Sequence, residues 1–363
     1  MSRAAVSLES VVAGLRADGR LDEAQAAEAE ALTGKLRDVQ PWYVRAMVSF
    51  GAWLASLWLI GFVAGLGILV GGFVVVGLAL IAGAVTLRRQ LDNDFVVQAT
   101  LAASIAGQAL LAWGIADSGP GESMELLCGV IIAVSGVLFF IFPDRIHRVL
   151  SVLFAASALV VLLYVIEWNA AVPLLGPALA AALVTVHRKR AALTAAGQGH
   201  LLRPLESGLM LSAFGCLLLS TVYLLPALGS EFVFYPRPWI STVLLGALLL
   251  YVGSFTLRPL LEGSTAVPVT YGLMLAVIAC AWAAPGILLA LIVILLGAAA
   301  GERTSARAGI AFLSVFVTAY FYGMETTMLA KSITLCATGA AILGARYLLL
   351  RLAGARPTGD SHA

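Results

Sequence analysis

Apolar stretches of about 20 residues recur along almost the whole chain, and short connections between them hold most of the charged residues. An α-helix needs about 20 residues to cross the ~30 Å hydrocarbon core of a bilayer, and helices satisfy their own backbone polar groups there. Only 12% of the residues are charged and 61% are hydrophobic, so the chain has too little polar surface to be soluble alone. The pattern predicts an all-α fold, a polytopic transmembrane helical bundle embedded in the lipid bilayer.

Dividing these stretches by the length of a membrane-crossing helix predicts about twelve spans. The longest inner connection separates six from six, so we expect a first membrane half at residues 43–187, a cytosolic loop at 188–205, a second half at 206–350 and a cytosolic tail at 351–363. The spans are expected at residues 46–66, 68–87, 95–115, 124–142, 149–167, 170–187, 206–228, 239–257, 266–284, 286–301, 308–325 and 327–349.

The positive charges predict the orientation of the spans. If the N-terminus is cytoplasmic, all but two of the 22 Lys and Arg residues fall on inner connections, as the positive-inside rule requires. The two exceptions are Arg237 and Lys331. Both termini are therefore expected in the cytoplasm, and four tryptophans are expected at the outer span ends as an aromatic belt: Trp113, Trp168, Trp239 and Trp282.

Residues 1–42 are polar and are expected to form a short cytosolic helical hairpin. Leu8, Val11, Val12 and Leu15 mark one helical face, and Asp18-Gly19 ends that helix. Two interpretations stay open: a solvated segment lying against the membrane face, or a docking module for a cytosolic partner.

Several classes of function lack support in the sequence. The net charge of +2 argues against a nucleic-acid partner. The four cysteines fall in four different spans without metal-ligand spacing, so neither a metal site nor a cofactor is expected. His147, His187 and His200 are expected to be solvated or to contact lipid headgroups. Glycine pairs such as Gly297-x-x-x-Gly301 are expected at helix–helix contacts.

One intramembrane polar site is a candidate. Lys331 is expected roughly 7 Å below the outer boundary, close to Glu325, Tyr320 and Tyr322. It either extends to the headgroups or pairs structurally with Glu325, or it serves as an anion or proton site with Glu325 as counter-ion.

A second candidate is the outer loop before span eight. Glu231 and Arg237 are expected to form an exposed ion pair there, and Tyr235 to be an interface anchor. The same loop is also a possible partner-binding edge.

Two segments carry a family resemblance: PWYVRAMVSFGAWLASLWLIGF near the first span, and AYFYGMETTMLAKSITLCATGAAILGARYLL at the last hairpin. The terminal pattern comprises an aromatic run, a turn at Gly323, Thr326 and then Lys331-Ser332, which adds Thr326 and Ser332 to the candidate polar site. The chain resembles the bacterial membrane family DUF4401 (domain of unknown function), a relative of DUF2157. The resemblance implies a multi-pass protein of the bacterial cytoplasmic (inner) membrane, often accompanied by a small membrane-anchored partner of the GDYXXLXY type.

These observations favour a membrane scaffold or accessory subunit rather than an enzyme. The alternative is a secondary transporter of a small solute that uses the Lys331/Glu325 region. An integral enzyme that acts on lipid-linked sugars is the least favoured class, because the outer loops hold only one arginine.

Overall fold

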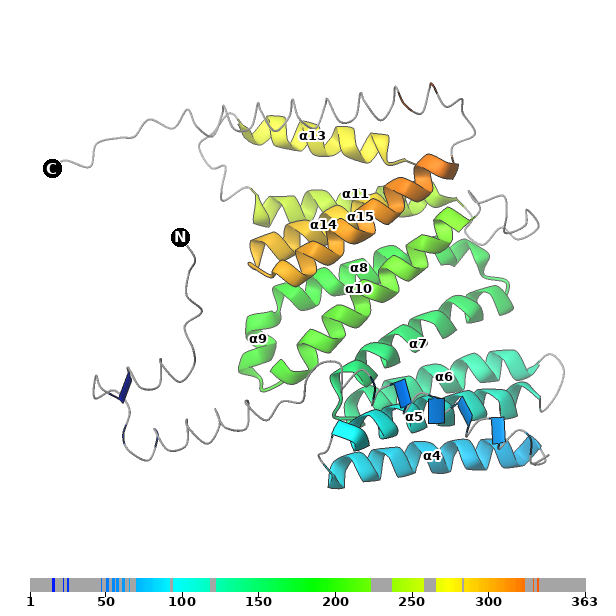
Figure 1. Ribbon diagram of the computed structural model, residues 1–363. Helices are drawn as coiled ribbons and strands as arrows, with labels where there is room; N and C mark the ends of the chain where they lie inside the picture. The colour runs from blue at the N-terminus through cyan, green and yellow to red at the C-terminus, as the bar shows by residue number, and fades with distance from the viewer. Residues whose placement is uncertain are drawn as a thin grey trace. The chain divides into compact units, whose positions relative to one another are not determined.

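The computed structural model describes residues 70–91, 94–117, 122–222, 237–257, 266–282 and 284–323, together with single residues between 15 and 65 and at 329 and 332 (Figure 1). These residues are almost entirely helical and include no strand, which confirms the all-α prediction for this part of the chain. The helices are α4 (Val70–Gln90), α5 (Asp94–Ala116), α6 (Glu122–Ile141), α7 (Arg145–Val165), η1 (Asn169–Ala171), α8 (Val172–Arg188), α9 (Arg190–Ala195), α10 (Gly199–Val222), α11 (Pro238–Thr256), α13 (Ala266–Cys280), α14 (Pro285–Ala299) and α15 (Arg303–Gly323).

Eight of these helices are long and apolar enough to cross a membrane, so the protein is a membrane protein. Helices α13 and α14 are equally apolar but have 15 residues each, about 22 Å of helix. The second to eleventh predicted spans each coincide with a helix, whereas the first and last lie largely outside the described residues. The count of twelve, the two six-span halves and the cytoplasmic termini stay predictions.

By its internal contacts the chain divides into two units, residues 1–68 with 76–107 and residues 69–75 with 108–363. In the first unit, Gly107 of α5 packs on α4, where a Cβ atom would lie 2.7 Å from the carbonyl oxygen of Gly77. In the second unit, Gly114 of α5 lies equally close to Val74 of α4. Small residues thus allow the backbones of α4 and α5 to approach closely.

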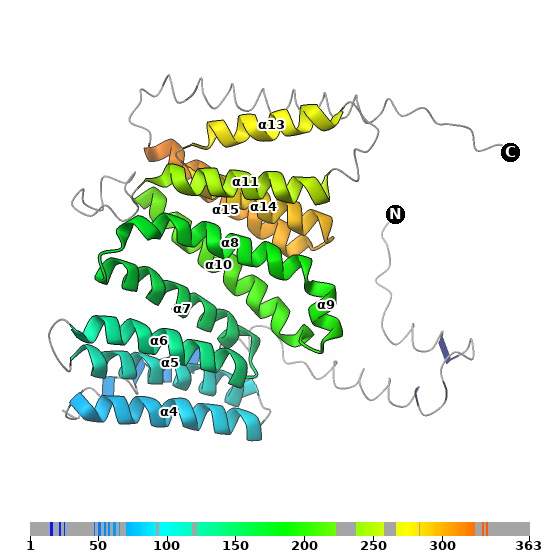
Figure 2. The ribbon, with the colours of Figure 1, turned by 180° about the vertical axis from the view of Figure 1, so that it is seen from behind.

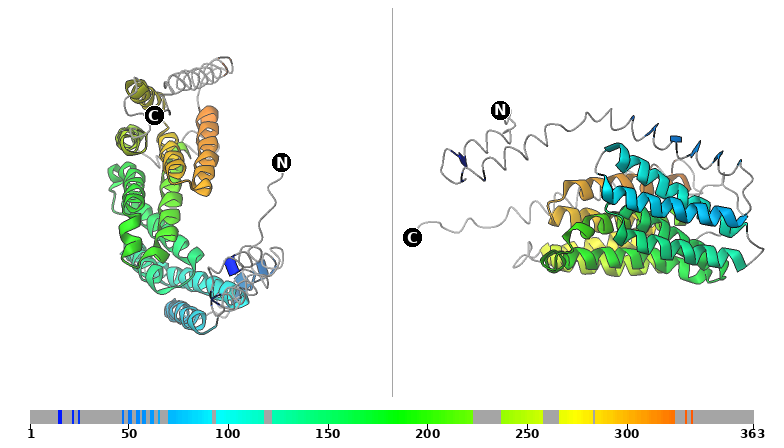
Figure 3. Two further views of the ribbon diagram at one scale, coloured as in Figure 1. Left: turned by 90° about the vertical axis from the view of Figure 1, so that its left-hand side faces the viewer. Right: turned by 90° about the horizontal axis from the view of Figure 1, so that it is seen from below.

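The second unit holds the larger hydrophobic core. Side chains of α8, α10, α11 and α14 fill it, and Leu217, Leu245 and Leu288 are fully buried. The rings of Phe214 in α10 and Phe312 in α15 stack with centroids 3.8 Å apart. Helices α14 and α15 lie side by side in every view (Figures 1 and 3).

Two helices of this core, α8 and α10, contain an internal proline, and in each a side chain from another helix donates to the carbonyl oxygen to which the proline cannot donate. Pro177 in α8 has no N–H to donate to the carbonyl of Pro173, and the hydroxyl of Ser241 in α11 donates to that oxygen at 2.5 Å. Pro204 in α10 likewise has no N–H to donate to the carbonyl of His200, and Arg148 of α7 donates to that oxygen at 3.5 Å. Both helices continue through their prolines.

The bond from Ser241 also places the first turn of α11 beside the first turn of α8. At the same end, Thr242 donates to the carbonyl of Trp282 at 2.8 Å. Each tryptophan of the predicted belt lies exposed at or near a helix end, as the sequence predicts: Trp113, Trp168, Trp239 and Trp282. Which side of the membrane they face stays a prediction.

The cytosolic loop expected at residues 188–205 is mostly helical. Residues 190–195 form α9, which Figure 2 shows beside α10. Helix α10 begins at Gly199, before the predicted span start at residue 206. The prediction placed the boundary after Pro204, but α10 continues through this proline. The result is that Glu206 lies within a helix instead of at its edge.

Candidate functional site

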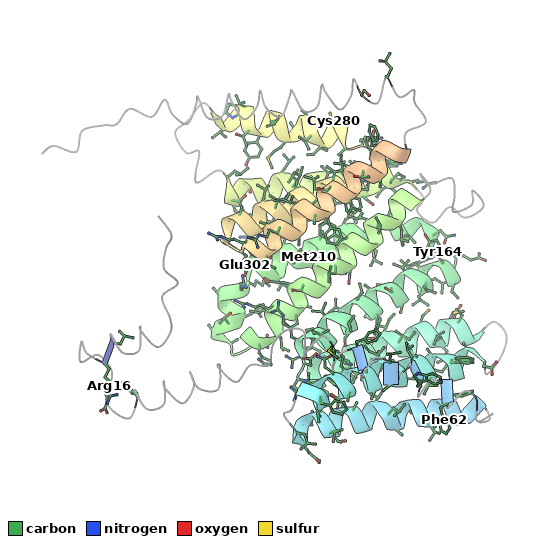
Figure 4. The ribbon with its side chains drawn as sticks, viewed as in Figure 1. Arg16, Phe62, Tyr164, Met210, Cys280 and Glu302 are labelled. Atoms are coloured by element: carbon green, nitrogen blue, oxygen red, sulfur yellow. The ribbon has the colours of Figure 1, made fainter. Side chains whose placement is uncertain are left out.

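A cavity of about 330 Å³ opens in the second unit where three arginine-rich connections meet. These connections are the start of α7, the segment from the end of α8 to the start of α10, and the junction between α14 and α15. We call this space the Glu206 cavity. Apolar side chains also line it, including Leu183, Met210 and Val293. Figure 4 shows Glu302 at the α14–α15 junction and Met210 further along α10.

Glu206 is the most buried acid of this cavity. Its side chain is only 12% exposed and lies seven residues after the start of α10, which is about 10 Å along the helix axis. Oxygen Oε1 is buried without a hydrogen bond, and its neighbour is Nδ1 of His187 at 3.6 Å. The second oxygen, Oε2, lies 3.8 Å from Arg190. Both distances exceed those of a direct hydrogen bond, so the carboxylate keeps unused acceptor capacity.

Arg190 of α9 connects two acids from different parts of the chain. Its guanidinium lies 2.6 Å from Glu302, which precedes α15, and 3.8 Å from Glu206. The hydrogen bond to Glu302 is the main cause that raises the pKa of Arg190 above its ordinary value. Since Glu302 also accepts from Ser305 at 3.2 Å, the α14–α15 junction is anchored to α9.

The carboxyl of Glu302 titrates at lower pH than usual. Burial alone would raise its pKa, but the hydrogen bond and the charge of Arg190 together lower it below the ordinary value of 4.5. The pair of Arg190 and Glu302 is therefore ionised at neutral pH.

Arg145 and Arg203 supply positive charge at the cavity. Both side chains are exposed and line the cavity. Within the part of the chain that the structure describes, neither makes an ion pair with an acid. The cavity thus combines two uncompensated guanidinium groups with a buried, under-bonded carboxylate.

A buried cluster at the start of α7 adjoins this region. Asp144 caps α7 by accepting from the backbone of Ile146 and His147. His147 is only 1% exposed, its ring stacks on Phe142 at 4.1 Å, and its Nδ1 lies 3.2 Å from the hydroxyl of Ser151. The expectation that His147 is solvated or contacts lipid headgroups is wrong, because its ring is buried against Phe142 and Ser151.

Most of the polar site predicted near the last hairpin lies outside the described residues. These are Lys331, Glu325 and Thr326, and the side chain of Tyr322 is not described either. Tyr320 is partly buried near the end of α15, and Ser332 is helical and exposed. In the outer loop, Glu231 and Tyr235 also lie outside, while Arg237 is exposed and precedes α11 with a left-handed backbone (φ 52°). Both predicted sites stay predictions.

The Glu206 cavity was not predicted from the sequence. The available signal was the presence of acidic residues, Glu206 and Glu302, beside connections otherwise rich in arginine. That these two acids share Arg190 follows only from the tertiary structure, which brings the Arg190 side chain within reach of both.

A known protein family matches most of the chain. A family model described as "Domain of unknown function (DUF4401)" matches residues 41–352. No curated protein and no solved structure matches the chain.

Proposed function

The chain belongs to the DUF4401 family, and we propose that it is a secondary transporter that binds a small polar solute in the Glu206 cavity. The description of the family names no function, so this proposal rests on the site of the chain itself. This proposal moves the transport site from the Lys331 region, where the sequence suggested it, to the opposite, arginine-rich ends of the helices. The observation that carries it is the under-bonded carboxylate of Glu206.

An ionisable side chain inside a membrane helix needs a reason, because its burial is costly. Arginines at helix ends are explained by topology alone, but a glutamate that is 12% exposed is not. A purely structural ion pair would bring its partner within direct hydrogen-bond distance, as Arg190 does with Glu302 at 2.6 Å. Glu206 is instead separated from both of its neighbours by 3.6 to 3.8 Å, which leaves an acceptor available to a solute or a proton.

The chemistry of the cavity indicates the kind of solute. A volume of about 330 Å³ is at the low end for small-molecule sites. An anionic group of the solute would bind Arg145 and Arg203, while a hydrogen-bond donor would reach Glu206. The proximity of His187 to Glu206 supports proton exchange between them, which would couple solute binding to protonation.

The accessory role stays a second prediction. The large apolar side chains exposed on α6 and α15, such as Phe140 and Ile310, suit contact with a partner helix, but contact with lipid requires the same exposure. A small GDYXXLXY-type partner, a relation to DUF2157 and a place in the bacterial inner membrane are proposals that rest on the resemblance. The gathering of arginines at one end of these helices supports an orientation with the cavity open to the cytoplasm.

The experiment measures binding first. The Tm of the purified wild type, of Glu206→Gln and of the control Glu125→Gln is measured with and without an excess of phosphate, a monocarboxylate, a dicarboxylate or an amino acid. Glu125 is an exposed acid on α6, away from the cavity. A solute at about 100 times its Kd stabilises by about 2.7 kcal/mol, or roughly 5–10 °C in Tm. At least one class should produce this shift in the wild type and in Glu125→Gln but not in Glu206→Gln.

Transport is then tested with the solute that binds. Proteoliposomes with an imposed pH gradient should accumulate this solute with wild-type protein and not with Glu206→Gln. If no class shifts the Tm, or if Glu206→Gln responds like the wild type, the cavity is not the site. Binding without uptake would contradict the transporter part of the proposal.

A further inference from the structure

A second feature of the same unit lies away from the Glu206 cavity and is independent of the proposed transport function. It is a shallow apolar groove of about 500 Å³ between these two helices. From α8 it is lined by Leu174, Pro177, Ala178 and Ala181. Their spacing of three and four residues places them on one face of the helix.

Helix α11 lines the groove with the same spacing, through Leu244, Ala247, Leu248 and Tyr251. The two helices run in the same direction, because Ser241 bonds Pro173 at their starts and Tyr251 bonds Arg188 near their ends. Alanines on both sides leave space that larger side chains would fill. The only polar side chain of the lining is that of Tyr251.

An arginine lies where the groove ends. Arg188 donates a hydrogen bond to the hydroxyl of Tyr251, and its guanidinium lies 5.4 Å from the ring of Tyr251 and 5.3 Å from the ring of Phe255. The two rings hold the guanidinium in place. Arg188 is exposed and makes no ion pair with an acid of the described residues, and the neighbouring Lys189 is exposed too.

We propose that this groove binds an anionic phospholipid, with one acyl chain between α8 and α11 and the phosphate on Arg188. From Arg188 to Ala181 is about 10 Å along the helix, and to Leu174 about 21 Å. One leaflet of hydrocarbon is about 15 Å thick, so an acyl chain that starts at Arg188 covers the alanine-lined part of the groove. The positioned charge at its end complements a phosphate, and planar guanidinium groups bind phosphate through two parallel hydrogen bonds.

The test uses native mass spectrometry of the full-length protein in mild detergent, titrated with phosphatidylglycerol or with phosphatidylcholine of the same acyl chains. Arg188→Gln removes the charge, and Ala181→Phe or Ala247→Phe fills the groove. The controls are Arg303→Gln, an exposed arginine that starts α15, and Ala133→Phe, an exposed alanine on α6. Variants are compared only when their elution volume and Tm match those of the wild type.

Both lipids carry a phosphate, but the choline ammonium of phosphatidylcholine compensates its charge, whereas phosphatidylglycerol keeps a net negative charge for Arg188. The wild type should therefore bind one phosphatidylglycerol about tenfold more tightly than phosphatidylcholine. Arg188→Gln should reduce this preference to less than about twofold, and the groove variants should lose both lipids, while both controls bind like the wild type.

Three results would overturn the proposal. Equal affinity of the wild type for the two lipids would remove the role of Arg188. Unchanged binding in both groove variants, or equally strong competition by soluble glycerol 3-phosphate, would show that the acyl chain is not recognised. A photo-crosslinker at residue 181 that joins a protein instead of a lipid would assign the groove to a partner helix. Because neither Arg188 nor Ala181 lines the Glu206 cavity, these results are separable from the transport test.

Discussion

Replacing Ser241 by alanine tests how α8 tolerates its internal proline. Ser241 is fully buried, and its hydroxyl is 2.5 Å from the carbonyl oxygen of Pro173, to which Pro177 has no N–H to donate. Removing the hydroxyl leaves a buried carbonyl with poorer hydrogen bonding. Such a loss costs about 1–3 kcal/mol in protein interiors, and hydrogen bonds between membrane helices average nearer 0.6 kcal/mol. We expect a loss of about 1–2 kcal/mol, a decrease in Tm of roughly 2–8 °C.

The cost of Ser241→Ala should depend on Pro177. In a Pro177→Ala background the new backbone N–H can donate to the carbonyl of Pro173, so Ser241→Ala should cost less there by about 1 kcal/mol. The assay is a double-mutant cycle of thermal unfolding in one detergent. Ser254→Ala is the matched control in α11, because its hydroxyl bonds the carbonyl of Tyr251 within a regular helix. The reasoning is refuted if Ser241→Ala costs the same with and without Pro177, or if Ser254→Ala costs as much.

Three further predictions concern the region of the cavity. Gly297→Ala should lower the free energy of unfolding by about 1–3 kcal/mol, because its Cβ atom would lie 2.6 Å from the backbone nitrogen of Ala306. Thermal unfolding should show that the control Gly136→Ala is neutral or stabilising, because its Cβ atom would have no atom within 4 Å. Arg190 lowers the pKa of Glu302, so the ionised Glu302 stabilises the folded protein fully above pH 4.5, and this contribution is lost as the pH falls further. When the pH is lowered from about 6 to about 3.5, the Tm of Glu302→Gln should therefore fall less than that of the wild type. Arg190→Gln should lower the stability by about 1 kcal/mol through loss of its ion pairs, while the exposed neighbour Lys189→Gln should leave Tm unchanged.

The helices could be predicted from the sequence because lipid imposes a simple rule on composition and length. The span expected at residues 124–142 is α6, Glu122–Ile141, and that expected at 239–257 is α11, Pro238–Thr256. The start of the helix was less predictable at α10, where a span was expected from residue 206 and the helix begins at Gly199 and continues through Pro204. The glycine pair Gly297-x-x-x-Gly301 was half right: Gly297 contacts α15, whereas Gly301 ends α14 with φ 68°.

The candidate cavity could not be predicted in the same way, since its chemistry depends on which connections meet. Glu206 and Glu302 are 96 residues apart, and nothing in either segment shows that Arg190 lies between them. The charge pattern indicated that these connections share one side of the membrane. It could not indicate that five helices enclose a space there, or that one carboxylate would be buried without a hydrogen bond.

The account depends most directly on a water-accessible cavity at the arginine-rich end of these helices. Ser207 lines the cavity next to Glu206. Its accessibility is measured by introducing Ser207→Cys into a protein whose native cysteines have been replaced, and by applying membrane-impermeant thiol reagents to either side of vesicles. Cysteines at Thr304, on the cavity side, and at Trp168, at the opposite helix ends, identify the two sides.

We predict that Ser207→Cys reacts only from the side that labels Thr304→Cys, and faster with an anionic sulfonate reagent than with a cationic reagent because of Arg145 and Arg203. No reaction at position 207, or reaction from the side that labels Trp168→Cys, would contradict the account.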